Sequence, residues 1–173
     1  MKRKLVLGIV ASLLLVVVFM FTAGTSALTP TEEANKAVIR DCVAKFWNAG
    51  NVDVIGEFYS TDLINHDPTR PLITNFEEFK ASKITGFPKS SITVTIVYLI
   101  AEGDLVAKLF TSVVTPKATG ISRTGAGCTV YQLKDGLIIG IWPNRDDLGT
   151  KLQLGWTLVP PPADPPADRI GGR

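Results

Sequence analysis

One histidine and two adjacent aspartates are the side chains of this sequence best suited to acid–base chemistry. His66 is the only histidine of the chain, and an imidazole can exchange a proton near neutral pH. Asp146 and Asp147 follow an apolar segment that ends at Trp142, and burial against an aromatic ring can keep a carboxyl group protonated. Each candidate has a structural alternative. In this alternative, His66 is a turn residue before Pro68. The aspartates then lie at the start of a helix, where the helix dipole favours negative charge.

The remaining residue types exclude several kinds of site. The chain has one histidine and two distant cysteines, Cys42 and Cys128, so a zinc site of histidine and cysteine ligands is not expected. No metal and no other cofactor is predicted. We find no glycine-rich phosphate loop and no nucleophile elbow in the context that these motifs need. The sequence does not distinguish two possibilities for the cysteines, a disulfide between them or a pair of buried thiols.

The charge balance argues against a nucleic-acid-binding protein. The chain of 173 residues has a formal net charge of +2, but three basic residues occupy positions 2–4. From position 28 onward, 15 basic residues stand against 16 acidic ones, with no basic run that could contact phosphates. With 46% hydrophobic residues, the chain is also too apolar to be disordered throughout.

Residues 1–27 have the composition of a signal peptide or an N-terminal membrane anchor. Three basic residues precede an uncharged run over Leu5–Phe21, and small residues follow as far as Ala27. The run of 17 residues is longer than the ~7–15 residues of a usual signal and shorter than the ~20 that span a bilayer. Both alternatives are kept. In either case we expect the domain to be exported, secreted or anchored, and to contact a membrane only through this segment.

Residues 28–158 are predicted to form one domain, followed by a disordered proline-rich tail over 159–173. Its first half is predicted to be helical over residues 29–50, 52–59 and 74–83, because apolar residues recur there at helical spacing. A Thr-x-x-Glu capping box opens the first of these helices, and Thr74 with Glu77 opens the last.

The second half of the domain is predicted to form an antiparallel meander. Apolar and threonine residues alternate from Ile92 to Ile96, which is typical of a half-buried strand. Asp135-Gly136 is a strong two-residue hairpin signal. Helices followed by a meander indicate an α+β fold with helices packed on one face of the sheet. The further strands are predicted over Leu105–Thr115, Gly127–Lys134 and Leu137–Trp142.

Five short motifs follow one another along this domain. They are Phe46–Asn51, Asn65–Pro68, Ala101–Ala107, Arg123–Gly125, and a final block of Lys134–Gly136, Trp142, Asp146, Leu148-Gly149 and Gln153–Gly155. In type and order these motifs resemble the SnoaL-like polyketide cyclase or ester cyclase branch of the nuclear transport factor 2-like superfamily. The resemblance extends from about Val38 to Gly155.

The resemblance implies a cone-shaped fold, in which N-terminal helices pack on a curved antiparallel sheet and leave a pocket at the open end. Family cyclases close a ring by aldol condensation with an aspartate as acid and base. That aspartate matches Asp146, and a pocket histidine matches His66. Trp47, Phe58, His66, Trp142 and Asp146 are then expected to converge on one cavity. The residues expected to bind the substrate there are Trp47, Asn48, Phe58 and Trp142.

Two functions follow, from different classes. The first is an exported module that binds a small hydrophobic molecule in the cone without chemistry. The alternative is a cofactor-independent cyclase or isomerase, which acts through Asp146 on a carbonyl or ester substrate. A homodimer through the sheet is a further expectation, and no nucleic acid is expected as a partner.

Overall fold

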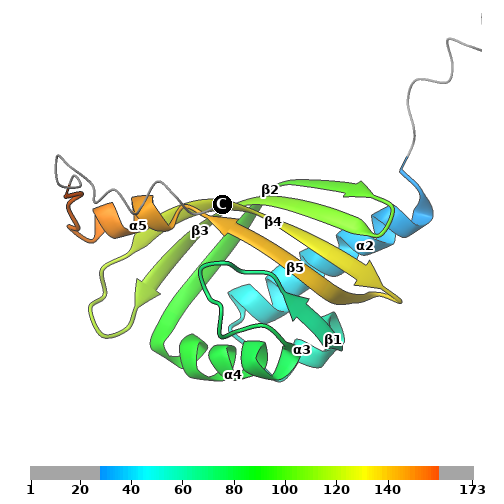
Figure 1. The fold of residues 1–173 in the computed structure, drawn as a ribbon, viewed down its shortest axis with the longest axis horizontal. Helices are drawn as coiled ribbons and strands as arrows, with labels where there is room; N and C mark the ends of the chain where they lie inside the picture. Colours follow the sequence, from blue (N-terminus) through cyan, green and yellow to red (C-terminus); the bar gives the residue numbers. More distant parts are fainter. Residues whose placement is uncertain (1–27, 160–173) are drawn as a thin grey trace, which may run out of the picture.

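A curved five-stranded sheet forms the upper layer of the molecule in Figure 1, a computed structural model that describes residues 28–159. The strand order is β1-β5-β4-β3-β2. Strands β2 to β5 form an antiparallel meander, and β1 pairs with β5 in parallel. The strands are β1 Tyr59–Asn65, β2 Ser90–Glu102, β3 Leu105–Pro116, β4 Arg123–Lys134 and β5 Leu137–Arg145.

The helices cover the inner face of this sheet, so the predicted α+β fold is confirmed. The first predicted helix consists of α2 (Pro30–Asp41), which continues as a π-helix, η1 (Cys42–Asn48). It ends at Gly50, whose φ of 61° favours glycine. The predicted capping box at its start is present, because Thr29 Oγ1 accepts from Glu32 N and Glu32 accepts from Thr29 N.

Two predicted helices need correction. The helix expected over 52–59 shrinks to α3 (Ile55–Phe58), and the chain then enters strand β1, which was not predicted. Helix α4 (Phe76–Gly86) begins with a capping box of Asn75 and Glu78, one residue later than the predicted pair Thr74 and Glu77. Thr74 instead adds two further hydrogen bonds to the Glu78 carboxylate.

The two remaining helices lie at the same end of the sheet, where β2 begins and β5 ends. A 3-10 helix, η2 (Phe87–Lys89), leads into β2, and α5 (Asp147–Gln153) follows β5. The predicted hairpin at Asp135-Gly136 is confirmed, with φ values of 52° and 77° at the two turn residues. The signal or anchor predicted over 1–27 and residues 160–173 of the predicted tail lie outside the described residues. Between residues 28 and 159, no helix is both long and apolar enough to span a bilayer.

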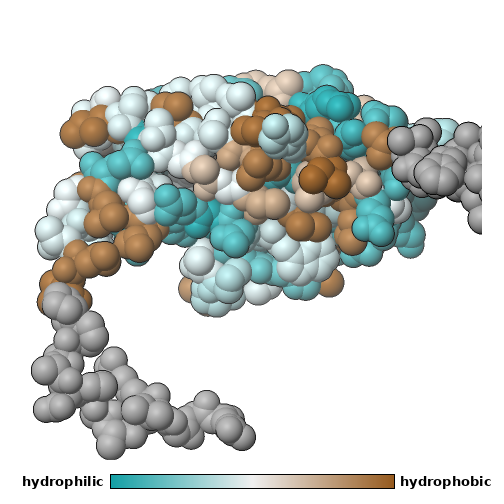
Figure 2. Space-filling view, turned by 90° about the horizontal axis from the view of Figure 1, so that it is seen from above, coloured by the Kyte–Doolittle hydropathy of each residue, from teal (hydrophilic) through white to brown (hydrophobic). Residues whose placement is uncertain are grey.

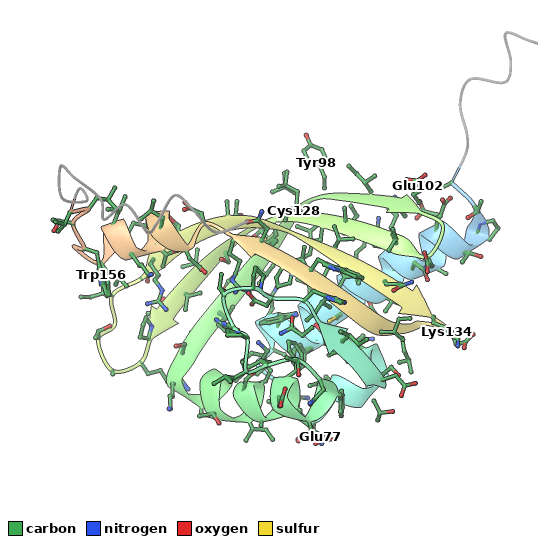
Figure 3. The ribbon with its side chains drawn as sticks, viewed as in Figure 1. Glu77, Tyr98, Glu102, Cys128, Lys134 and Trp156 are labelled. Atoms are coloured by element: carbon green, nitrogen blue, oxygen red, sulfur yellow. The ribbon has the colours of Figure 1, made fainter. Side chains whose placement is uncertain are left out.

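The hydrophobic core lies between the helices and the inner sheet face, whereas the outer face carries exposed apolar residues. Phe46, Tyr59, Leu63, Val106 and Ile138 are each at most 2% exposed in this core. On the opposite face, Tyr98 points away from the sheet (Figure 3), and apolar side chains gather over the strands (Figure 2). This outer apolar face consists of Val97, Tyr98, Ile100, Leu105, Leu109 and Val113.

Candidate ligand-binding site

A cavity of ≈ 340 Å³ lies between the inner face of the sheet and helix α4. Strands β2 to β5 form one wall, and α4 with the loop after β1 forms the other. Aromatic and aliphatic side chains share this lining with charged and hydroxyl side chains, and a small-molecule site combines an apolar wall with oriented polar groups. The apolar and aromatic lining residues include Trp47, Phe79, Ile92, Val94, Phe110, Tyr131 and Ile141.

The alternation of strand β3 determines which of its side chains face this cavity. Lys108, Phe110 and Ser112 line the cavity, whereas Leu109 between them is exposed on the outer face, because successive strand residues point to opposite faces. Gly127 of β4 pairs with Phe110, and a Cβ at this glycine would lie 2.9 Å from Phe110 Cζ. The missing side chain therefore leaves room for the Phe110 ring across the neighbouring strand.

Two lysines are buried in the cavity wall, one from each layer. Lys83 of α4 is 8% exposed, and its Nζ lies 4.6 Å from the Trp47 ring centroid and 4.5 Å from that of Phe79. Lys108 of β3 is 3% exposed, with Nζ 4.7 Å from the Phe110 ring centroid. Within the described part of the chain, neither ammonium group has an ion-pair partner. Both are stabilised by aromatic faces instead.

The surroundings of Lys83 favour its neutral form. Burial lowers the pKa of Lys83 to about 7, because an ammonium group removed from water loses its hydration. The charges of Arg70 and Arg145 lower the pKa further, and the carboxylate of Asp67 opposes them. At neutral pH this side chain can therefore both accept and donate a proton.

An ion pair joins the loop after β1 to the end of β5 at the edge of the cavity. Arg145 Nη2 lies 2.7 Å from Asp67 Oδ2, and the backbone N–H and hydroxyl of Thr69 donate to Asp67 Oδ1. Burial raises the pKa of Asp67, but the hydrogen bonds from Arg145 and Thr69 outweigh burial and leave the pKa below its usual value. The carboxylate is therefore ionised at neutral pH and fixes Arg145 in place.

Neutral polar groups complete the lining. The hydroxyl of Tyr59 accepts hydrogen bonds from Trp47 Nε1 and Cys42 Sγ, and burial raises the pKa of Tyr59 well above its usual value. Asn65 Nδ2 donates to the Ile73 carbonyl, whereas the buried Asn65 Oδ1 accepts from no other described group. This amide oxygen is available to a hydroxyl or N–H group of a ligand.

His66 and Trp142, predicted to line the cavity, lie together outside it. Asn65 pairs with Ile141 in the β1–β5 ladder, so the next residue of each strand points to the outer face. The two rings stack there with centroids 4.4 Å apart and planes 3° from parallel. Both side chains are exposed. The sequence therefore predicted the proximity of these two residues but placed them on the wrong face of the sheet.

Asp146 is the N-cap of α5 and does not reach the cavity. Its Oδ1 accepts a hydrogen bond from Gly149 N at 2.7 Å, and the residue is exposed. The structure thus matches the structural alternative from the sequence, an acid at a helix entrance, and Asp146 itself is the cap. Asp147 is also exposed, and its Oδ1 lies 3.7 Å from Arg145 Nε.

Of the other predicted residues, only Trp47 lines the cavity. The amide of Asn48 is used in two hydrogen bonds to the backbone of Val94, which attach η1 to β2. Phe58 is 5% exposed and packs in the core. The predicted convergence of Trp47, Phe58, His66, Trp142 and Asp146 on one cavity is therefore wrong.

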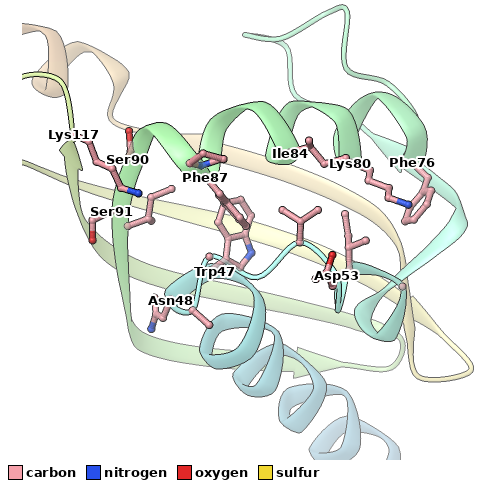
Figure 4. Close-up of a pocket in the computed structure, with 17 residues that line it drawn as sticks. Trp47, Asn48, Asp53, Phe76, Lys80, Ile84, Phe87, Ser90, Ser91 and Lys117 are labelled. Carbon is pink, nitrogen blue, oxygen red and sulfur yellow. The ribbon is translucent and has the colours of Figure 1, made fainter.

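A second, wider groove of ≈ 890 Å³ lies on the outside of the helical layer, between the end of η1 and α4 (Figure 4). Trp47 and Phe87 lie between this groove and the inner cavity and line both. Figure 4 shows Asn48 beside it and Lys80 along α4. The groove runs along the protein surface, so we take the inner cavity as the candidate site.

The two cysteines are free, and their surroundings differ. Cys42 is buried, and burial raises its pKa to about 11. Cys128 is exposed and lies on the outer face of the sheet. The structure therefore contains neither a disulfide nor a pair of buried thiols.

Four of the polar cavity residues were missed from the sequence: Asp67, Lys83, Lys108 and Arg145. Lys108 could have been found from the sequence. Val106, Lys108 and Phe110 share one face of the predicted strand, and Lys108 is the charged residue between two apolar ones. A lysine at such an inward position needs a partner or a function. For Lys83 the helical pattern of α4 gave no comparable signal.

Comparisons with known proteins agree with this architecture. Residues 39–141 match the sequence profile of the SnoaL-like domain. A candidate polyketide cyclase from Acidithiobacillus ferrooxidans superposes with a TM-score of 0.65 at 22% identity, over 76% of this chain and 98% of that one. A candidate SnoaL-like polyketide cyclase from Jannaschia sp. CCS1 gives a TM-score of 0.67 at 18% identity, over 79% and 100% of the two chains.

An enzyme of another kind shares the same fold. An LEH-like epoxide hydrolase from M. tuberculosis superposes with a TM-score of 0.64 at 14% identity, over 72% of this chain and 92% of that one. At these identities the likeness establishes the cone fold alone. The comparison with curated protein sequences gives no match.

Proposed function

The chain belongs to the SnoaL-like family, and on this premise we propose that it binds a small, largely apolar carbonyl compound in the cone cavity. The observation that supports this proposal most directly is the ≈ 340 Å³ cavity, walled by aromatic and aliphatic side chains from both layers. The buried ammonium groups of Lys83 and Lys108 supply hydrogen-bond donors for the carbonyl oxygen of such a ligand.

Binding of the unsaturated ketone benzalacetone to the domain over residues 28–158 tests this proposal. We expect the ketone to raise the melting temperature and to give a saturable signal in titration calorimetry. Ser112→Phe narrows the cavity from β3 and should weaken binding at least tenfold. Thr111→Phe places the same ring on the outer face of the same strand, and it should leave the affinity within twofold. Equal affinities of the two variants would contradict a site in the cone.

A second candidate function, proton transfer on a bound ketone, has one specific observation in its favour. The Lys83 amine faces the cavity and has a pKa of about 7. As a general base it would take a proton from the carbon next to the carbonyl group, leaving an enolate and an ammonium group, and then return the proton. In this version of the isomerase hypothesis the acid–base group is Lys83, because Asp146 caps α5.

Exchange of the methyl protons of benzalacetone in deuterated water, followed by proton NMR, tests the second candidate. We expect the wild-type protein to accelerate exchange at pH 7 and Lys83→Met to abolish the acceleration. Asp146→Asn is the matched control and should retain it. If the ketone binds but its exchange is not accelerated, the protein is a binding module.

We also propose that the N-terminal segment exports this domain. The basic residues, apolar run and small residues of positions 1–27 support export. Fractionation of the native host should recover the protein outside the cytoplasm, either cleaved after Ala27 or membrane-attached. Full-length protein recovered from the cytoplasmic fraction would contradict the proposal.

A homodimer through the sheet is our proposal for assembly. The outer apolar face, with Tyr98 65% and Ile100 68% exposed, supports it. Light scattering should give a dimer mass for the domain and a monomer mass for Ile100→Glu. Glu77→Lys on α4, remote from this face (Figure 3), is the control and should stay dimeric.

A further inference from the structure

The cavity wall is strongly basic, although the chain as a whole is nearly neutral. Five basic residues line the cavity, Arg70, Lys83, Lys108, Arg123 and Arg145, against the single acidic residue Asp67. Asp67 is already paired with Arg145. The remaining four positive side chains have no ion-pair partner in the described part of the chain.

Two of these four, Lys83 and Lys108, are more than nine-tenths buried. A buried ammonium group without a carboxylate partner is destabilising, because the aromatic faces around it replace only part of its lost hydration. Folded proteins retain such groups mainly where a function requires them. A negatively charged group in the cavity would supply the missing partner to both lysines, which approach it from opposite layers.

We propose that the natural ligand of this cavity is an organic anion, with an apolar body among the aromatic residues and one anionic head held by Lys108 and Lys83. This inference rests on the proposed ligand-binding function and specifies its ligand class. Half-buried Arg123 and exposed Arg70 also line the cavity, and their positive field would draw an anion toward it.

Binding of such an anion is coupled to proton uptake. The charged groups that set the protonation of Lys83 are Arg70, Arg145 and Asp67, and burial with the two arginines lowers its pKa to about 7 in the ligand-free protein. An anion beside the amine raises this pKa again, since it favours the charged form. Above pH 7, binding therefore draws a proton from the buffer, and affinity for the anion falls as the pH rises.

The test compares cinnamate with benzalacetone, in which a methyl ketone replaces the carboxylate on the same phenyl-propenyl body. We expect cinnamate to bind at least tenfold more tightly at pH 7, because charge-assisted hydrogen bonds are stronger than neutral ones. Phenyl phosphate is titrated in parallel. Tighter binding of either anion than of the ketone supports the proposal. The anion with the higher affinity identifies the preferred head group, carboxylate or phosphate.

Lys108→Met keeps the length of the side chain and removes its charge. We expect this variant to lose at least tenfold in cinnamate affinity, to lose clearly less in benzalacetone affinity because a neutral carbonyl oxygen makes the weaker hydrogen bond, and to unfold at an equal or higher urea concentration than wild type. Lys134→Met, at the exposed β4–β5 hairpin (Figure 3), is the control and should change none of the three. A purely structural role for Lys108 predicts the reverse, with lower stability and unchanged anion preference.

Calorimetry at pH 8 in two buffers of different ionisation enthalpy measures the proton uptake. We expect uptake with cinnamate in wild type and none in Lys83→Met. If benzalacetone binds and neither anion binds more tightly, the anion inference is overturned and the ligand-binding function stands. If none of the three compounds binds, both are overturned.

Discussion

His66 and Trp142 stack face to face on the outer side of the sheet, with ring centroids 4.4 Å apart. His66 directly follows the edge strand β1, which pairs in parallel with β5, the strand of Trp142. The ring of Trp142 also covers Gly140 of β5. The pair is therefore a surface feature beside the β1–β5 ladder. Trp47, on the other side of the sheet, is the tryptophan that lines the cavity.

This arrangement predicts which tryptophan reports ligand binding. Benzalacetone should change the intrinsic fluorescence of the wild-type domain. Trp142→Phe should keep this change, because residue 142 faces outward. Trp47→Phe should lose most of it. A ligand response that disappears with Trp142 instead would place the site on the outer face.

Asp146 is expected to act as a helix cap and nothing more. Asp146→Ala removes the acceptor for Gly149 N and should destabilise α5 by about 1 kcal/mol, whereas Asp146→Asn retains a good cap. Hydrogen exchange of the Gly149 amide measures this difference and should be faster only in the alanine variant. If Asp146→Asn lost ligand binding and Asp147→Asn did not, Asp146 would belong to the binding site, and a role as a helix cap alone would be contradicted.

The Asp67–Arg145 ion pair is predicted to stabilise the fold in a pH-dependent way. Because the pKa of Asp67 is lowered in the folded state, the stabilisation is complete above the usual aspartate value of about 3.9 and is lost as the pH falls through the lowered pKa. Asp67→Asn should therefore cost about 1–3 kcal/mol at pH 7. Urea unfolding should show the two proteins converging as the pH falls through the lowered pKa of Asp67, whereas Asp147→Asn should match wild type throughout.

Lys83 is predicted to destabilise the ligand-free protein, most strongly at low pH. Its pKa is about 7 in the folded state and about 10.4 when exposed, so the unfolded chain binds more protons between these values. Wild-type stability therefore rises with pH in this window. Lys83→Met should be more stable than wild type at pH 6, and the difference should shrink toward pH 10 in urea unfolding. A constant difference would mean that Lys83 does not titrate as described.

The cysteines should differ sharply in reactivity. Cys42 is buried and its pKa is raised to about 11, so almost no thiolate is present at pH 8. A disulfide reagent should modify one thiol of the native domain rapidly, and this reaction should vanish in Cys128→Ser. In urea, two thiols should react in wild type. Two rapidly modified thiols in the native protein would contradict the burial of Cys42.

Short-range features of the fold were predictable from the sequence because their causes are local. The capping box at Thr29, the glycine that ends η1 and the Asp135-Gly136 hairpin depend on a few adjacent residues. The meander followed from alternation within each strand. Family motifs then indicated the cone, which the comparisons confirm.

Only the tertiary structure showed that residues 59–65 form strand β1 and on which face of the sheet each candidate side chain lies. Strand β1 exists because it pairs with β5, more than 70 residues later in the chain, and no local pattern encodes that partner. The same pairing places His66 and Trp142 on the outer face, since a shift of one residue along a strand reverses the direction of a side chain. The cavity instead receives Lys108 from β3 and Lys83 from α4. Their meeting in one basic cavity depends on the packing of a helix against a distant strand, which the order of residues alone does not express.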